Sequence, residues 1–115
     1  GHYAPTADFE LLSKAYRIAS DKGMTVYVGS TLCNDRLYID NKPEYCRAWA
    51  EYGTLATEME GAALYTTAAR YDTKALMILS IVQNVYRPNE TVSEDTKEKK
   101  LDDMIRLALH TLTDR

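Results

Sequence analysis

Residues 57–65 read Thr57-Glu58-Met59-Glu60-Gly61-Ala62-Ala63-Leu64-Tyr65, and they follow a short extended piece at 54–57. The Ala-rich and Leu-rich composition that follows predicts a helix near 59–71. In an extended segment, Glu58 and Glu60 would share one face, and a nearby helix N-terminus would favour their charge. A carboxylate held there could accept hydrogen bonds from both hydroxyls of a sugar diol. The alternative is an ordinary acidic first turn on a buried helix, which is a common pattern.

Helices and strands alternate on both sides of this stretch. The pattern predicts these elements: a helix at 6–22 capped by Thr6 and stopped by Gly23, a strand at 24–29, a loop at 30–42, a helix from Pro43 to Tyr52, a strand at 75–82, and a helix capped by Ser93 that runs to about 112. Such alternation indicates an α/β fold with helices packed on a sheet. Two clear strands are few for that sheet, so the piece at 54–57 is a candidate third strand and the chain is expected to be incomplete.

Size and charge exclude several classes of protein. The chain has 115 residues, of which 45% are hydrophobic, and this composition fits one globular domain and excludes general disorder. A formal charge of −3 gives no general attraction to nucleic acid or to an anionic membrane. No apolar run approaches the roughly 20 residues of a membrane helix, and the N-terminus lacks the pattern of a signal peptide. We therefore expect neither nucleic acid nor a membrane as a partner.

The cysteines and histidines do not form a metal-binding pattern. Cys33 and Cys46 are not a CxxC pair, and His2 and His110 lie at opposite ends of the chain. We therefore expect no metal site and, in the simplest interpretation, two reduced thiols in a cytoplasmic protein. A single disulfide is the alternative.

Two further segments could carry chemistry. Gln83-Asn84-Val85-Tyr86-Arg87 directly follows the apolar run at 75–82, where ligands collect in α/β sheets. Its amides could bind a base and Arg87 could bind an anion or hold the loop, although an ordinary polar loop would have a similar composition. The segment 29–38, with Gly29 after the first predicted strand, is a weaker candidate for an anion cradle because it carries no complete phosphate-binding motif.

Together these segments resemble the C-terminal half of the purine nucleoside phosphorylase and uridine phosphorylase family, especially its bacterial hexameric branch. Residues 57–65 are similar to that family's VEMEAAALY signature. Residues 3–12, 28–38 and 101–109 are similar to its FAPxADFxLL, VGNxxSxDxFY and FxDMIxIAL segments. The resemblance covers residues 3–112. It implies a single partial domain over residues 1–115, the C-terminal half of a three-layer fold with a mixed sheet flanked by helices.

The resemblance implies a purine nucleoside phosphorylase, which with phosphate converts a nucleoside to a free base and a pentose 1-phosphate. It places Glu60 on the ribose 2′- and 3′-hydroxyls, Met59 against the sugar, and Thr57 and Glu58 near the base. Leu32 falls where the family often has an aromatic residue that stacks on the purine. The expected substrates are a nucleoside and phosphate, with no cofactor and no metal.

The expected catalytic acid is absent from this sequence. The hexameric branch has Ser-Asp-x-x-Arg, and counting back from Asp103 places Asn84 at the Asp and Arg87 at the Arg, whereas counting forward from Ala75 places Gln83 there. We favour Asn84 because Arg87 then follows three residues later. An Asn cannot donate a proton as a carboxylic acid does. It can hydrogen-bond a purine, so either the enzyme handles 6-oxopurines or its activity is reduced or lost.

The family's phosphate loop belongs to its N-terminal half, and residues 1–30 show no similar motif. We therefore expect that this chain alone does not perform phosphorolysis. Three interpretations stay open. The chain is one part of a phosphorylase, completed by a complementary N-terminal half; or it is a degenerate nucleoside-binding module; or it is an assembly domain of a homo-oligomer.

Overall fold

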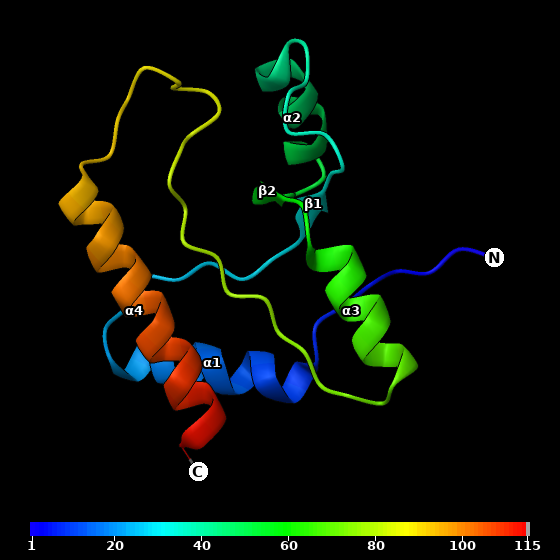
Figure 1. Cartoon of the computed structure of the whole chain (residues 1–115), viewed down its shortest axis with the longest axis vertical. Helices are drawn as coiled ribbons and strands as arrows, with labels where there is room; N and C mark the ends of the chain where they lie inside the picture. The colour runs from blue at the N-terminus through cyan, green and yellow to red at the C-terminus, as the bar shows by residue number, and fades with distance from the viewer. Residues whose placement is uncertain (115) are drawn as a thin grey trace.

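The computed structural model describes residues 1–114 and consists of helices around one small sheet (Figure 1). The elements are α1 (Phe9–Asp21), β1 (Thr31–Cys33), α2 (Lys42–Ala50), β2 (Ala56–Glu58), α3 (Gly61–Arg70) and α4 (Glu94–Thr113). The strands β1 and β2 pair in parallel, with α2 in the connection between them. This β-α-β order is the crossover that parallel pairing requires. The predicted α/β class is confirmed, and the piece at 54–57 does lead into a strand.

The register of the sheet decides which side chains share a face. Thr31 lies opposite Ala56, Leu32 opposite Thr57, and Cys33 opposite Glu58. Because side chains alternate along a strand, Leu32 and Thr57 lie on one face of the sheet. The first and last pairs lie on the other face, which therefore carries Glu58.

Two predicted strands are wrong in position. Residues 24–29 and 75–82 lie outside any strand, and β1 falls instead at 31–33, inside the predicted loop. A β-strand is stabilised by a neighbour that exchanges backbone hydrogen bonds with it. Within residues 1–114, no hydrogen bond involves the backbone of residues 25–29. The β-prone composition is present in both segments, but the described chain provides no strand beside them.

Two helices begin later than predicted. α1 starts at Phe9 because Asp8, rather than Thr6, provides the cap: its carboxylate accepts a hydrogen bond from the Leu11 amide at 2.9 Å. α3 starts at Gly61, two residues later than expected. The predicted cap on α4 is confirmed, since the Ser93 hydroxyl accepts a hydrogen bond from the Thr96 amide at 3.2 Å.

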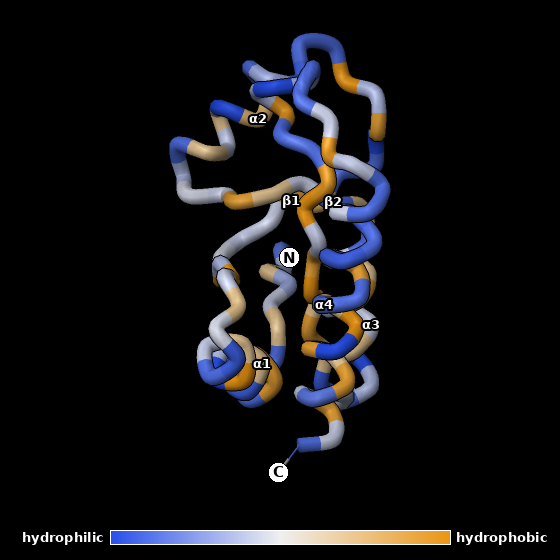
Figure 2. Tube along the Cα trace, turned by 90° about the vertical axis from the view of Figure 1, so that its left-hand side faces the viewer, coloured by the Kyte–Doolittle hydropathy of each residue, from blue (hydrophilic) through white to orange (hydrophobic). Residues whose placement is uncertain are grey.

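The core lies where α1 packs beside α4 (Figures 1 and 2). Its buried members are Ile18 and Ala19 of α1 and Leu107 of α4. Residues from both misplaced strand segments pack against it: Met24, Val26 and Ile78. The apolar character of these segments is therefore used for packing even though their backbones do not form a sheet.

A helix that spans a membrane needs about 20 consecutive, mostly apolar residues. Among residues 1–114, no helix combines the length and the hydrophobicity needed to cross a bilayer.

A matched pair of substitutions on α4 tests this core. Leu107 is 5% exposed and Leu112 is 72% exposed. We expect Leu107→Ala to lower the free energy of unfolding by about 2–5 kcal/mol, because it leaves a cavity, and Leu112→Ala to change it by less than about 0.5 kcal/mol. Urea unfolding followed by circular dichroism measures both. Equal losses in the two variants would contradict the packing of α4 on α1.

Candidate functional site

The carboxylate of Glu58 organises the turn between β2 and α3. Its Oε2 accepts hydrogen bonds from the backbone amides of Glu60 at 2.7 Å and Gly61 at 2.6 Å. Its Oε1 accepts a hydrogen bond from the Thr31 hydroxyl of β1 at 3.1 Å. Glu58 is only 9% exposed, and its charge faces the N-terminus of α3, where the helix dipole favours an anion. Glu58 therefore caps α3 and joins that helix to both strands.

Gly61 provides the space that this cap requires. A Cβ at position 61 would lie 2.8 Å from Oε1 of Glu58 and 3.1 Å from its carboxyl carbon. Such contacts are too short for nonbonded atoms, so a larger residue would push the carboxylate away from the helix. The Gly in this motif, where the family signature has Ala, thus fits the close approach of Glu58.

Glu60 has a different environment from Glu58. It is exposed, and its backbone is helical, with φ −118° and ψ −19°. Side chains therefore no longer alternate between the two faces of a strand at Glu60, because β2 ends at Glu58. The expectation that Glu58 and Glu60 share one face is wrong. One oxygen of Glu60 accepts a hydrogen bond from the Met59 amide at 3.2 Å. Met59 itself is 41% exposed, so the tip of this turn offers a carboxylate and an apolar side chain to a ligand.

Leu32 and Thr57 are brought together by the sheet. They are opposite each other in the register, on the face away from Glu58. Leu32 is half-buried and Thr57 is exposed. The residues predicted to lie near the base thus divide between the two faces of the sheet, with Leu32 and Thr57 on one face and Glu58 on the other.

Asn84 and Arg87 are the two ends of one turn. The Asn84 carbonyl accepts a hydrogen bond from the Arg87 amide at 3.0 Å, and the Asn84 side-chain oxygen accepts one from the Tyr86 amide at 2.9 Å. The guanidinium of Arg87 lies 3.5 Å from a carboxylate oxygen of Glu90. The spacing of three residues between Asn84 and Arg87 is therefore that of the first and last residues of a turn. It leaves the Asn84 NH₂ group as the donor that could meet a base.

The turn is also held from α2. The guanidinium carbon of Arg47 lies 5.8 Å from the centre of the Tyr86 ring, within the range of a cation–π interaction. Neither a periodic pattern nor a motif in the sequence indicates this pair.

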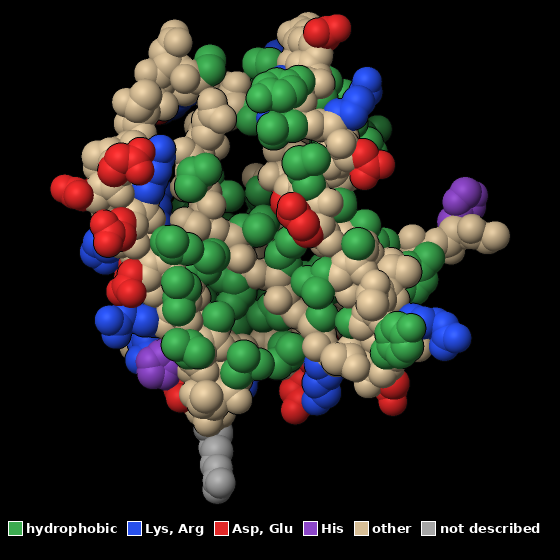
Figure 3. All heavy atoms as spheres, viewed as in Figure 1, with side chains coloured by type: hydrophobic (Ala, Val, Ile, Leu, Met, Phe, Trp, Pro, Cys, Tyr) green, Lys and Arg blue, Asp and Glu red, His purple; other side chains and the backbone are tan. Residues whose placement is uncertain are grey.

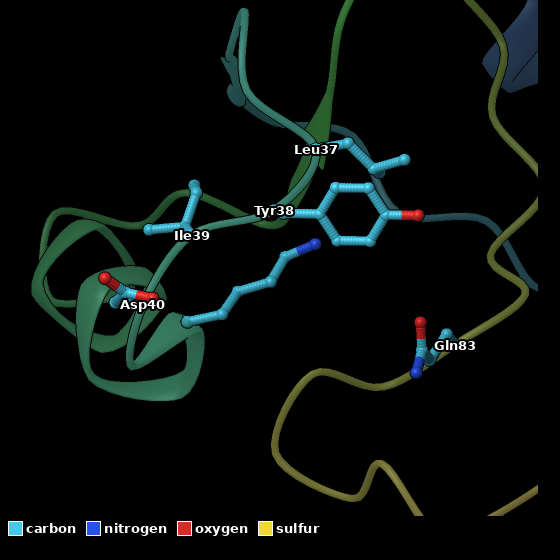
Figure 4. Close-up of a pocket in the computed structure, with 6 residues that line it drawn as sticks. Leu37, Tyr38, Ile39, Asp40 and Gln83 are labelled. Carbon is cyan, nitrogen blue, oxygen red and sulfur yellow. The ribbon is translucent and has the colours of Figure 1, made fainter.

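Gln83 lines an open cavity of about 350 Å³ beside the segment 37–40 (Figure 4). The other lining residues are Leu37, Tyr38, Ile39, Asp40 and Lys42. Figure 4 shows the Tyr38 ring projecting over the opening, with Gln83 on the opposite wall. Gly29, at the start of the 29–38 segment, lies against Leu55, since a Cβ at position 29 would lie 2.6 Å from a methyl carbon of that side chain.

The structure assembles these residues in two groups. Residues 57–60 gather with Thr31 and Leu32 at the sheet, and residues 83–87 form the separate turn. Within residues 1–114, no hydrogen bond or ion pair joins the two groups. Sequence reasoning missed Thr31, whose role becomes visible only when β1 is known to pair with β2.

Charges elsewhere are arranged as surface pairs. A hydrogen bond to Glu10 raises the pKa of Lys74, and a hydrogen bond to Asp102 raises the pKa of Arg106. Over residues 1–114, no three His, Cys, Asp or Glu side chains gather closely enough to hold a metal ion. Both cysteines are free thiols. The chemistry that the two groups offer is hydrogen bonding by a carboxylate, an amide and a guanidinium.

Comparison with known proteins identifies the family. The family model described as "Phosphorylase superfamily" matches residues 1–113. The chain belongs to the phosphorylase superfamily. The resemblance seen in the four sequence segments is thus confirmed, and the small parallel sheet with its helices is a part of the phosphorylase superfamily fold.

Several relatives of this superfamily member carry the name purine nucleoside phosphorylase DeoD-type. The protein of Bacillus velezensis is 46% identical over 111 residues, which are 96% of this chain and 47% of the relative. That of Clostridium perfringens (strain SM101) is 47% identical over 107 residues, covering 93% and 45%. That of Bacillus subtilis is 44% identical over 111 residues, covering 96% and 46%. The chain spans about half the length of the curated relatives it matches.

The unequal environments of the two motif carboxylates can be tested by mutation. We expect Glu58→Ala to lower the free energy of unfolding by about 1–3 kcal/mol, because three donors lose their acceptor. Glu60→Ala is the matched control and should change it by less than about 0.5 kcal/mol, since Glu60 is exposed. Thermal unfolding of both variants measures the difference. An equal effect of the two changes would show that Glu58 does not cap α3.

Proposed function

We propose that this chain supplies the ribose-binding and base-binding part of a purine nucleoside phosphorylase. The observation that carries the proposal is the exposed Glu60 carboxylate on the capped turn before α3, in a chain 46% identical to the Bacillus velezensis purine nucleoside phosphorylase DeoD-type. An anionic acceptor on a rigid turn suits the vicinal hydroxyls of a ribose. The reaction transfers the pentosyl group from the purine to phosphate.

Each of the candidate site residues has a separate role in the proposed phosphorolysis. In the transition state the ribosyl ring gains positive charge while the base leaves as an anion. Glu60 binds the 2′- and 3′-hydroxyls and places negative charge near the ring. Met59 packs on the sugar, and Leu32 and Thr57 border the base. Glu58 contributes by holding this turn, because its own oxygens are occupied by Thr31, Glu60 and Gly61.

Asn84 and Arg87 act on the base side. The Asn84 side-chain oxygen is already used by the Tyr86 amide, so its NH₂ group faces the purine as a neutral donor. A neutral donor stabilises a developing charge at a 6-oxo group or at N7 but does not deliver a proton. Arg87 fixes the turn through its backbone amide. Gln83, on the cavity wall, is the alternative donor.

A second candidate function is nucleoside binding without turnover. The observation that favours it is the same Asn84, because an amide replaces the catalytic acid of the hexameric branch. The phosphate loop expected for the family is also not matched by residues 1–30. In this case the Glu60 turn would still bind ribose, and the protein would act as a nucleoside-binding or assembly module.

The length of the relatives supports a proposal about the assembly. We propose that phosphorolysis needs a complementary N-terminal half that carries the phosphate site, within a homo-oligomer or in partnership with this chain. Phosphate is the co-substrate, and neither a cofactor nor a metal is proposed.

The two free thiols fit a reducing compartment, so we propose a cytoplasmic location. We also propose a role in purine salvage, which is the role of the phosphorylase activity proposed above.

Ribose binding is tested with a single carboxylate. We expect Glu60→Ala to weaken the binding of inosine by about tenfold or more, because hydrogen bonds to a charged acceptor are lost. The control is Glu98→Ala, which removes an exposed carboxylate from α4. Isothermal titration calorimetry with inosine measures both variants. Unchanged affinity in Glu60→Ala would remove the sugar-binding role from this turn.

Base selection is tested in the protein completed with its phosphate-binding part. If Asn84 restricts the base, inosine should be cleaved at least about tenfold faster than adenosine, and Asn84→Asp should raise the adenosine rate by restoring a proton donor. Phosphate-dependent release of hypoxanthine and adenine is the measurement. Comparable rates on both nucleosides would contradict the role of Asn84. No turnover of either would favour the binding module.

A further inference from the structure

Thr31 lies far from the acidic motif in sequence but touches it in the structure. Its hydroxyl donates a hydrogen bond to Oε1 of Glu58 at 3.1 Å, across 27 residues of chain. The other oxygen, Oε2, accepts hydrogen bonds from the backbone amides of Glu60 at 2.7 Å and Gly61 at 2.6 Å. Within residues 1–114, the Thr31 hydroxyl is the only hydrogen-bond donor to Oε1 of Glu58. The orientation of this buried carboxylate therefore depends on a side chain of β1.

Strand β1 places two polar side chains on the same face as Glu58. Thr31 lies opposite Ala56 in the register, and Cys33 lies opposite Glu58. Because side chains alternate along a strand, Thr31 and Cys33 share that face. The Cys33 sulfur accepts a hydrogen bond from the Ala62 amide at 3.4 Å, in the first turn of α3. One short strand thus contacts the start of α3 both through Glu58 and directly.

The amides at the start of α3 are occupied by side chains other than Glu60. Glu60 is the N-cap residue of this helix, yet its side chain makes no capping hydrogen bond. Glu58 accepts from the amides of Glu60 and Gly61, and Cys33 accepts from the amide of Ala62. Free amides at a helix N-terminus attract a carboxylate. Their occupation therefore leaves the Glu60 carboxylate available to a ligand.

The carboxylate of Glu60 lies at the surface beside an apolar side chain. Figure 3 shows an acidic side chain at the surface where the strands meet α3, with hydrophobic side chains around it. Glu60 is exposed, and Met59 is 41% exposed. One Glu60 oxygen accepts a hydrogen bond from the Met59 amide at 3.2 Å, before the helix begins. The place of this carboxylate is therefore set by the backbone of the turn that Glu58 holds.

We infer that Thr31 is a positioning residue for the ribose, which acts through Glu58 on Glu60. The inference rests on the proposed function, because it concerns the same sugar. Without the Thr31 hydroxyl, Oε1 of Glu58 loses its donor and the carboxylate turns away from α3. The released amides then attract the Glu60 carboxylate, and the ribose loses its acceptor. Thr31 thus keeps Glu60 directed at the 2′- and 3′-hydroxyls from a position outside the acidic motif.

The test compares Thr31→Val with Thr31→Ser in the full 115-residue chain. Valine keeps the shape and the strand preference of threonine but lacks the hydroxyl, whereas serine keeps the hydroxyl. The probes are inosine, which has both ribose hydroxyls, and 2′,3′-dideoxyinosine, which has neither. We expect Thr31→Val to weaken the binding of inosine by about fivefold and to leave that of 2′,3′-dideoxyinosine unchanged, because only inosine uses Glu60. Thr31→Ser should retain the affinity for inosine, and NMR titration measures each affinity.

Two further variants separate this inference from the proposed function. Thr66→Val makes the same replacement at an exposed position of α3 and should change neither affinity. Glu60→Ala should weaken the binding of inosine alone. If Glu60→Ala has this effect and Thr31→Val does not, the role of Thr31 is refuted while the proposed function stands. If neither variant weakens inosine binding, both are refuted. An equal loss for the two nucleosides in Thr31→Val would indicate damage to the fold and would also refute a positioning role.

The turn can also be followed without a ligand. Thr31→Val should speed hydrogen exchange at the amides of Glu60 and Gly61 by about fivefold or more, because their acceptor is no longer fixed. Thr31→Ser should keep the slower exchange, and circular dichroism checks that each variant retains its helices. Unchanged exchange at both amides in Thr31→Val would overturn the inference even if the chain bound no nucleoside.

Discussion

A buried carboxylate that needs donors is the constraint on which the local architecture depends. Burying a charge is costly unless hydrogen bonds compensate for the lost water. Glu58 meets this requirement with two backbone amides of the turn into α3 and the Thr31 hydroxyl of β1. This one arrangement satisfies donors at the start of α3 and joins that helix to both strands of the sheet. Gly61, which has no Cβ, leaves room for the carboxylate to lie close to the start of the helix.

Much of the fold could be predicted from the sequence because it depends on local signals. Ser93 and Gly23 mark helix ends by capping chemistry that acts over a few residues, and both positions hold. The predictions of strands at 24–29 and 75–82 are wrong because composition alone does not show whether a segment has a partner strand. A β-prone segment becomes a strand only beside a partner, and the described chain offers these two segments none.

The candidate site was predictable in its residue types more than in its geometry. The motif at 57–65 pointed to Glu60, which the structure places exposed at the turn before α3. The burial and capping role of Glu58 could not be predicted from the sequence. They depend on Thr31, which is 27 residues away in sequence and lies close only because β1 pairs with β2. The Arg47–Tyr86 contact is likewise a product of tertiary structure.

The hydrogen bonds of the Glu58 turn have a consequence for how the two groups of candidate site residues are held. Every bond that holds the turn lies within the stretch from Thr31 to Ala62, which contains both strands and the helix between them. The turn before α3 is therefore held by contacts that are close in sequence. The turn at 84–87 has a different support, because the Arg47 guanidinium of α2 lies against its Tyr86 ring. Helix α2, which connects the two strands, thus also links the candidate residues after β2 with those that follow the 75–82 segment.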